Sequence, residues 1–261
     1  MIDTTTTHPA RRYNYLLGGT DNFPADRESG DELARLNPAI KIAARENRAF
    51  LQRAVGFLAG QGVRQFVDIG TGLPTADNTH EVAQRIAPES RIVYVDNDPL
   101  VLVHARELLT STPEGRTAYL EADLRGPEKI LNDPVLRATL DLTRPVGLVL
   151  VSVLPFVPGD DVAGPIVRTL LDALPSGSYL VLSHATFDTL DAEVAAGYWE
   201  MFRAGKADIW PRTKAEFRDL FAGLELAEPG VVQVHEWRPR PDATLRAAKE
   251  INNWGAVGRK P

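Results

Sequence analysis

Three aspartates stand where predicted strands end. Asp68, Asp96 and Asp123 each follow a short run rich in apolar residues. In an open parallel sheet the carboxyl ends of the strands meet at one edge, and ligands bind there. One acid at such a place can be a helix N-cap, and Asp98 before Pro99 fits that role better. Three acids at equivalent places predict a ligand site.

The first of these acids opens a glycine-rich turn, Asp68-Ile69-Gly70-Thr71-Gly72-Leu73-Pro74. Glycine lets the backbone turn tightly and approach a ligand without a Cβ in the way. The turn supplies only the first two glycines of the dinucleotide fingerprint G-x-G-x-x-G. Asp96 can accept hydrogen bonds from both hydroxyls of a ribose, which NAD(P) and S-adenosylmethionine share.

The charge of the turn separates these two cofactors. A pyrophosphate beside Asp68 would be repelled by on the order of several kcal/mol in a partly dry cleft. S-adenosylmethionine carries an ammonium and a sulfonium, which a carboxylate attracts. Asp123 can meet the adenine amino group while the backbone of Leu124 meets the ring. The pattern favours S-adenosylmethionine, and an NAD(P)-dependent oxidoreductase is the third-ranked alternative.

The elements that position these residues alternate between strand and helix. Strands are predicted at 65–69, 91–95, 117–121, 146–151 and 178–183. Helices are predicted at 75–86, 99–109, 127–140 with a break at Pro134, and 162–174. This alternation predicts a doubly wound, mostly parallel α/β sheet with helices on both faces.

The N-terminal part departs from this alternation. Residues 1–9 are polar and are expected to be disordered. Residues 11–27 mix aromatic, charged and glycine residues without a period, so they are either an irregular cover of the core or a lid over the site. The lid candidates for contacts to substrate or cofactor are Tyr13, Tyr15, Asn22 and Phe23.

A long helix is predicted to begin at Asn37-Pro38 and to end near Gly60. After the sheet, helices are predicted at 190–203 and 213–223, two paired strands at 224–227 and 231–237, and an edge strand at 254–260. We expect one domain, residues 1–261, with a helical cap at about 10–60 and an α/β core at about 64–261.

Composition excludes several function classes. A net charge of −6 and a pI near 5.5 argue against nucleic-acid binding. The absence of cysteine rules out disulfides and thiolate catalysis, and the five scattered histidines predict no metal site. No signal-peptide pattern or membrane-length apolar run occurs, so a cytoplasmic protein is expected, of unknown oligomeric state.

Several segments resemble a known family. They are YNYLLGG at 13–19, DNF at 21–23, DIGTGLPT at 68–75, YVDNDP at 94–99, EADLR at 121–125, SHAT at 183–186 and GAVGRK at 255–260. They are similar to the actinobacterial S-adenosyl methyltransferase family once catalogued as a domain of unknown function. The resemblance implies a class I, Rossmann-like methyltransferase fold with seven strands, the last antiparallel.

The resemblance also implies roles by motif. The glycine turn would line the methionine part of the cofactor, Asp96 the ribose, and Asp123 with Leu124 the adenine. Ser152 and Val153 would lie where the cofactor and substrate clefts meet. The cofactor-binding candidates are Asp68, Gly70, Thr71, Gly72, Asp96, Asn97, Asp123, Leu124, Ser152 and Val153.

Methyl transfer from a sulfonium is an in-line displacement, for which alignment supplies much of the rate. A base is needed only when the acceptor is protonated. His184, at the end of the fifth strand, is the candidate base, with a hydrogen-bonded structural histidine as the other interpretation. Arg11 and Arg12 either recognise an acidic substrate or are solvated.

Two functions are therefore the leading hypotheses. The first is a methyltransferase acting on an unidentified, small-molecule acceptor. The second is a protein that binds S-adenosylmethionine without catalysis, as a sensor or a decayed enzyme. The second rests on Pro155, because the family usually has a histidine at this position.

Overall fold

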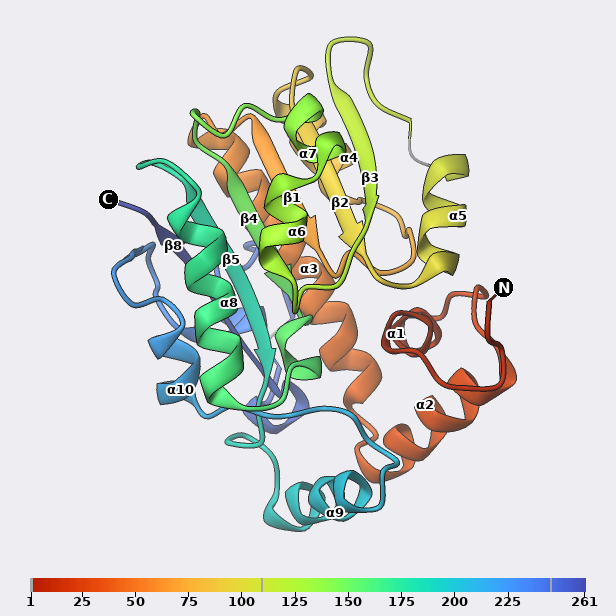
Figure 1. Cartoon of the computed structure of the whole chain (residues 1–261). Helices are drawn as coiled ribbons and strands as arrows, with labels where there is room; N and C mark the ends of the chain where they lie inside the picture. Colours follow the sequence, from red (N-terminus) through yellow and green to blue (C-terminus); the bar gives the residue numbers. More distant parts are fainter. Residues whose placement is uncertain (1, 109, 245) are drawn as a thin grey trace.

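Five parallel strands make up most of the sheet: β1 (Gln65–Ile69), β2 (Arg91–Asp96), β3 (Arg116–Glu121), β4 (Gly147–Val151) and β5 (Tyr179–Ala185). The computed structural model describes residues 2–108, 110–244 and 246–261. The strands stand in the order β3-β2-β1-β4-β5 (Figure 1). The order reverses between β1 and β4, which is the switch point where such sheets bind ligands.

The sheet continues with β8 (Asn253–Arg259), which runs antiparallel to β5 over its whole length. Two short strands, β6 (Glu225–Leu226) and β7 (Val232–Gln233), both pair with β8. The described ranges thus form eight strands rather than the seven expected. β8 lies inside the sheet, not at its edge. The predicted pairing between 224–227 and 231–237 was wrong, because the free side of β8 takes up both segments.

Helices follow the strands as predicted and are α4 (Thr79–Ile86), α5 (Pro99–Leu108), α6 (Pro127–Asn132), α7 (Pro134–Thr139), α8 (Asp160–Asp172), α9 (Ala192–Arg203) and α10 (Lys214–Asp219). The predicted break is confirmed, because Asp133 ends α6 and its side chain caps α7. α4 begins four residues later than expected, at the capping box of Asn78 and Glu81. The predicted end at 109 lies outside the described residues.

Alternate residues of each strand enter two hydrophobic clusters, one on each face of the sheet. Val67 and Val93 pack with α6, α7 and α8, whereas Phe66 and Ile92 pack with α3 (Ile40–Gly60) and α4. Figure 1 shows α6, α7 and α8 on one face and α3 on the other. This alternation points Asp68, one residue after Val67, to the α3 side. None of the helices in the described ranges is long and apolar enough to cross a membrane.

The N-terminal segment is helical, and the expectation of an irregular segment at 11–27 was wrong. α1 (Pro9–Leu17) and α2 (Pro24–Leu36) each begin with a proline in the first turn. The His8 side chain caps α1, so the expected disorder does not extend to residues 8 and 9. The hydrophobic pattern of the sequence did not predict α1, because the inner face of this helix buries mainly arginines rather than apolar residues.

α3 begins at Ile40, three residues after the predicted N-cap, because the Asn37 side chain binds the amide of Ala39 in a turn instead. In Figure 1, α1, α2 and α9 lie beyond the carboxyl ends of the parallel strands. α9 packs on α2, where Gly197 faces Leu36. The division into a cap and a core stays a prediction.

Candidate active site

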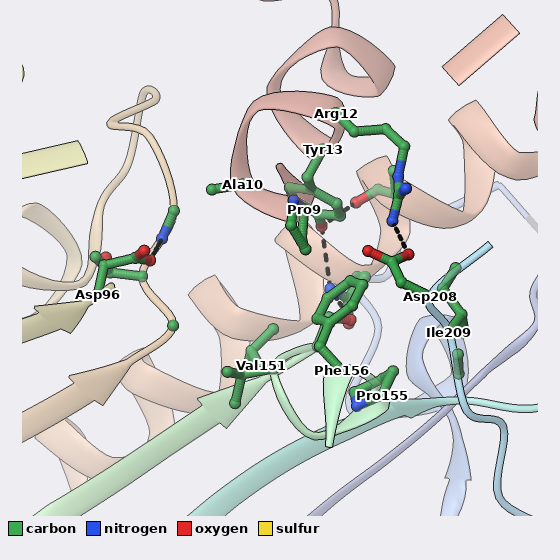
Figure 2. A pocket seen from close by; sticks show the side chains of 18 of the residues that line it. Pro9, Ala10, Arg12, Tyr13, Asp96, Val151, Pro155, Phe156, Asp208 and Ile209 are labelled. Carbon is green, nitrogen blue, oxygen red and sulfur yellow. Dashed lines mark hydrogen bonds and ion pairs between the residues drawn. The ribbon is translucent and has the colours of Figure 1, made fainter. Parts of the chain in front are cut away.

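A cavity of about 390 Å³ lies between the carboxyl ends of the strands and the helices α1 and α3. All ten cofactor-binding candidates line it, and of the four lid candidates only Tyr13 does. We call the part around Asp68, the glycine turn, Asp96 and Asp123 the sheet half. We call the part around Arg12, Tyr13, Asn47, Phe156 and Asp208 the helical half. Figure 2 shows Asp96 at one end of the view and Asp208 at the other.

The glycine turn of the sheet half is held against its neighbours. Gly70 has a φ of 73°, and its amide donates to the carbonyl of Val95 over 2.8 Å. A Cβ at Gly70 would stand 2.4 Å from Val153. Gly72 has a φ of 67°, and a Cβ there would meet no protein atom within 4 Å. The turn therefore requires glycine at 70 for packing and keeps space open for a ligand at 72.

Asp96 is fixed by two backbone amides. Gly72 donates to its Oδ2 over 2.9 Å and Asp98 donates to its Oδ1 over 3.0 Å. Burial raises the pKa of Asp96. Each carboxylate oxygen accepts more than one hydrogen bond, so Asp96 retains capacity for the two hydroxyls of a ribose. Asn97 lines the cavity next to it and is exposed.

Asp68 lies at the bottom of the sheet half. Its Oδ2 accepts a hydrogen bond of 2.6 Å from Thr79, and burial raises its pKa to about 6. The nearby charge of Arg48 acts in the opposite direction. Arg48, on α3, donates from Nη2 to Asn78 over 2.9 Å, whereas its buried Nε has no partner among the described residues. An unpartnered guanidinium donor beside an acid suits a zwitterionic amino-acid group.

Asp123 stands at the rim. Arg125 donates to its Oδ1 from Nε over 2.9 Å, and this pairing lowers the pKa of Asp123 to about 2. The side chain is 39% exposed, while Leu124 is buried in the wall. The carboxylate of Asp123 is already paired with Arg125. We therefore expect an adenine ring to contact Leu124 and the adjacent backbone instead.

A buried polar network joins the two halves. Tyr13 donates from Oη to the carbonyl of Ala44 over 2.9 Å and accepts from Asn47 over 3.0 Å. The same Asn47 amide donates to Ser152 Oγ over 3.0 Å, and its Oδ1 accepts from Ser183 over 2.6 Å. Ser152 has a φ of 55°, a backbone strain that places it at the end of β4 beside the glycine turn. Asn47 thereby fixes Tyr13 relative to the strand ends.

Two ion pairs, each with a buried arginine, attach α1 to the rest of the protein. Arg11 donates to both oxygens of Asp98 over 2.8 Å each, and Arg12 pairs with Asp208 and lies over the ring of Phe156. Burial alone would raise the pKa of Asp98, but hydrogen bonds from Arg11 and from the amide of Leu100 lower it. Both arginines are 4% exposed. The alternative that they are solvated was wrong, because they are buried and paired with acids of the protein, whereas recognition of an acidic substrate by these arginines stays a prediction.

The cavity does not include His184. This residue is fully buried, its Nδ1 lies 2.8 Å from the carbonyl of Ala185, and its Nε2 lies 2.6 Å from Arg212. Arginine only donates, so Nε2 accepts and Nδ1 carries the proton. Burial lowers the pKa of His184 to about 3. His184 is thus placed as a structural histidine, and we do not retain it as a base.

Three of the four lid candidates also lie outside the lining. Tyr15 donates to Asp31 over 2.6 Å, Asn22 donates to Asn14 over 2.9 Å, and Phe23 packs under the guanidinium of Arg11. They stabilise α1 and α2. Pro155, by contrast, lines the helical half, and its carbonyl accepts from the amide of Trp210 over 2.8 Å.

Sequence reasoning missed Asn47, Phe156 and Asp208 in the helical half and Arg48 beside Asp68 in the sheet half. Asn47 left a signal, since it interrupts the apolar stripe of its helix. Arg48 and Asp208 left none, because exposed and buried charges look alike in a sequence. Among the described residues, no group of three or more His, Asp or Glu side chains is placed to hold a metal ion.

Fold and site together define a class I methyltransferase. Strand order, the antiparallel β8, the glycine turn and the acids at three strand ends all match that class. The chain belongs to the S-adenosyl methyltransferase family, whose model matches residues 1–261. It is an S-adenosylmethionine-dependent methyltransferase, with S-adenosylmethionine as its cofactor.

Solved structures agree with this assignment. A DUF574 family protein from Streptomyces avermitilis is 51% identical, with full coverage of both chains and a TM-score of 0.94. A protein from Thermobifida fusca, named as a methyltransferase candidate, is 42% identical over 99% of this chain and 96% of its own, with a TM-score of 0.90.

A Methanosarcina mazei S-adenosylmethionine-dependent methyltransferase shares the fold at 15% identity, over 76% of this chain and 92% of its own, with a TM-score of 0.51. Among proteins with curated functions, none matches the chain significantly.

Proposed function

We propose that this chain methylates a small-molecule acceptor by in-line displacement. The observation that carries the proposal is the continuity of one cavity from the acids of the sheet half to the helical half. The sheet half fits the cofactor, and the helical half is enclosed by side chains from α1, α3 and the segment at 208–209. A concave site lined by side chains of this kind suits a small molecule.

The residues of the sheet half fit the cofactor chemically. Asp96 would hold the ribose hydroxyls, and Leu124 with the neighbouring backbone would line the adenine. Asp68 would attract the ammonium, and the free Nε of Arg48 would donate to the carboxylate of the methionine part. When bound, the cofactor supplies an activated methyl group on a sulfonium.

The protein's own contribution is alignment and exclusion of water. Val153 and Ser152 stand between the two halves, and Asn47 holds Ser152 and Tyr13 in one network. Because the acceptor and the methyl group are held in a fixed geometry, the reaction avoids much of the entropy cost of bringing two free reactants together. α1 closes the cavity and is pinned by its two arginine pairs.

Labelled-methyl transfer tests the proposal. The protein is incubated with methyl-labelled S-adenosylmethionine and an extract of Streptomyces avermitilis, separated into molecules below and above about 1 kDa. We expect label in the small fraction. Label confined to the large fraction would contradict a small-molecule acceptor. No transfer despite cofactor binding would favour the alternative of a binding protein without catalysis. A single domain and a cytoplasmic location belong to the proposal as predictions.

A further inference from the structure

Tyr13 and Asn47 have already used their side-chain hydrogen-bond donors at the junction of the two halves. The hydroxyl proton of Tyr13 points to the carbonyl of Ala44, and both amide protons of Asn47 are given to Tyr13 and Ser152. Because an oxygen of this kind has a second lone pair, Tyr13 Oη can still accept. At this place the protein therefore offers an acceptor and no free proton from Tyr13 or Asn47.

Two further residues of the lining, Asp208 and Asn252, also offer acceptors. Arg12 donates to one carboxylate oxygen of Asp208, and 43% of that side chain remains exposed. Asn252 also lines the cavity and is 5% exposed, and its Oδ1 accepts no hydrogen bond from any described residue. A buried oxygen without a partner is costly unless a ligand supplies a donor.

Asn253 adds a further polar residue to the lining, and most of the remaining wall of the helical half is apolar, including Leu16, Leu33, Ile40, Ala43, Ala44 and Phe156. Figure 2 shows Phe156 between Tyr13, Asp208 and Pro155. A ligand that satisfies this half has an apolar body and brings hydrogen-bond donors.

Among the described residues of this half, the carboxylate of Asp208 is the candidate base, and a carboxylate is a weak base for the proton of an alcohol. His8 is the only histidine among the described residues that line the cavity. Its Nδ1 lies 3.3 Å from Oδ2 of Asp98, the acid that pairs with Arg11 and not with Arg12. Burial raises the pKa of Tyr13, which disfavours a phenolate. An alcohol needs its proton removed for attack, whereas a neutral amine attacks through its lone pair.

Resting on the proposed function, we propose that the methyl acceptor is an amine on an apolar body, with its N–H groups bound by Tyr13 Oη, Asp208 and Asn252. The amine binds as an ammonium, which first loses one proton to water. The lone pair thus freed on nitrogen forms the new N–C bond, and the electrons of the breaking S–C bond stay on sulfur. The positive charge passes from sulfur to nitrogen, and the methylammonium then loses a proton to water. The Asp208 carboxylate favours charge that develops on nitrogen.

Calorimetry on the full chain saturated with S-adenosylhomocysteine tests this assignment. The probes are 2-phenylethylamine, 2-phenylethanol and phenylacetate, which share an apolar body and differ in their polar group. We expect the amine to bind at least about tenfold more tightly than the other two, as for a charge-assisted hydrogen bond. Equal binding of the alcohol or the acid, or no binding of the amine, would overturn the proposal.

Variants of Asp208 test whether this residue causes the preference for the amine. Asp208→Asn should reduce the preference for the amine to less than about threefold, because the amide carries no charge. Asp208→Glu keeps the carboxylate and should keep the preference. Glu32→Gln is the matched control, since Glu32 on α2 pairs over 3.5 Å with Lys206, two residues before Asp208, and lies outside the cavity. A preference retained in Asp208→Asn would overturn the role of Asp208.

The order of measurements separates two failures. If the unmodified chain does not bind S-adenosylhomocysteine, the proposed function fails before any amine is added. If it binds S-adenosylhomocysteine and does not select the amine, only the amine assignment fails. Retained S-adenosylhomocysteine affinity in Asp208→Asn shows that this variant is folded.

Discussion

The two halves of the cavity are built on different principles. The sheet half consists of turns that directly follow β1, β2 and β3, so its residues stand at fixed places in the fold. The helical half is assembled from α1, α3, the turn after β4 and the segment at 208–209, which lie far apart in the sequence. The first half is set by topology, and the second by side-chain contacts such as Arg12 with Asp208. We therefore expect cofactor recognition to depend on backbone geometry and acceptor recognition on individual side chains.

The largest effect on cofactor binding is expected for Gly70→Ala. The new Cβ would overlap Val153 and require a left-handed backbone, which together cost about 2–5 kcal/mol. Calorimetry with S-adenosylhomocysteine measures the loss. Gly223→Ala is the matched control, because Gly223 has a φ of 82° but no atom within 4 Å of its Cβ position. Equal affinity in both variants would break the claim that the turn is rigidly packed.

Asp96→Ala comes next. It removes an acceptor for the ribose hydroxyls and should weaken cofactor binding by about 1–3 kcal/mol. The same variant frees the amide of Gly72, so thermal unfolding should be recorded beside calorimetry. An unchanged dissociation constant would remove Asp96 from the cofactor site.

Arg48→Gln should weaken binding of S-adenosylhomocysteine by about tenfold, as expected for one charge-assisted hydrogen bond. Methylthioadenosine lacks the amino-acid carboxylate, so its affinity should not change. Calorimetry with both ligands checks this difference. A parallel loss for both would show that Arg48 acts on the fold of the sheet half and not on the carboxylate.

The pH dependence of cofactor binding tests Asp68. Its pKa is raised to about 6, so it is largely protonated below that pH and ionised above it. Because the ammonium favours the ionised form, affinity should rise by up to about tenfold between about pH 5 and about pH 7. Asp68→Asn should remove most of this rise. A steep rise that persists in the variant would assign it to another group.

The same raised pKa has a consequence for stability without cofactor. The folded protein holds the Asp68 proton at a pH where the unfolded chain has lost it. The free energy of unfolding should therefore decrease as pH rises from about 4 to about 6. Urea unfolding of the protein and of Asp68→Asn across this range measures the contribution.

The smallest effect on the cofactor is expected in the helical half. Asp208→Asn should change the affinity for S-adenosylhomocysteine by less than about twofold, because the ion pair of Asp208 runs to Arg12 on α1 and not to the strand ends. Calorimetry with the purified variant checks this. A loss as large as that of Asp96→Ala would mean that the two halves are not separable.

The predictability of the two halves follows the same division. Short apolar runs predicted all five parallel strands, and acids after three of them predicted the sheet half, because strand ends are local features of the sequence. The antiparallel β8 was predicted as a strand but placed at the edge, since only its two short partners, β6 and β7, put it inside. The helix α1 was missed because its buried face carries Arg11 and Arg12, which pair with Asp98 and Asp208 far along the chain.

His184 shows the limit of reasoning from strand ends. It follows Ser183 on β5, near the edge where ligands bind, but its ring turns toward Arg212 and away from the cavity. Asn47 shows the opposite case. A polar residue inside an apolar helical stripe was visible in the sequence, yet its partners Tyr13 and Ser152 became apparent only in three dimensions.

One calorimetric experiment tests the central claim most directly, that the acids of the sheet half select S-adenosylmethionine. The unmodified protein is titrated with S-adenosylmethionine, S-adenosylhomocysteine and NADH under one set of conditions. The account predicts saturable binding of the first two and none of NADH. Binding of NADH alone would contradict it.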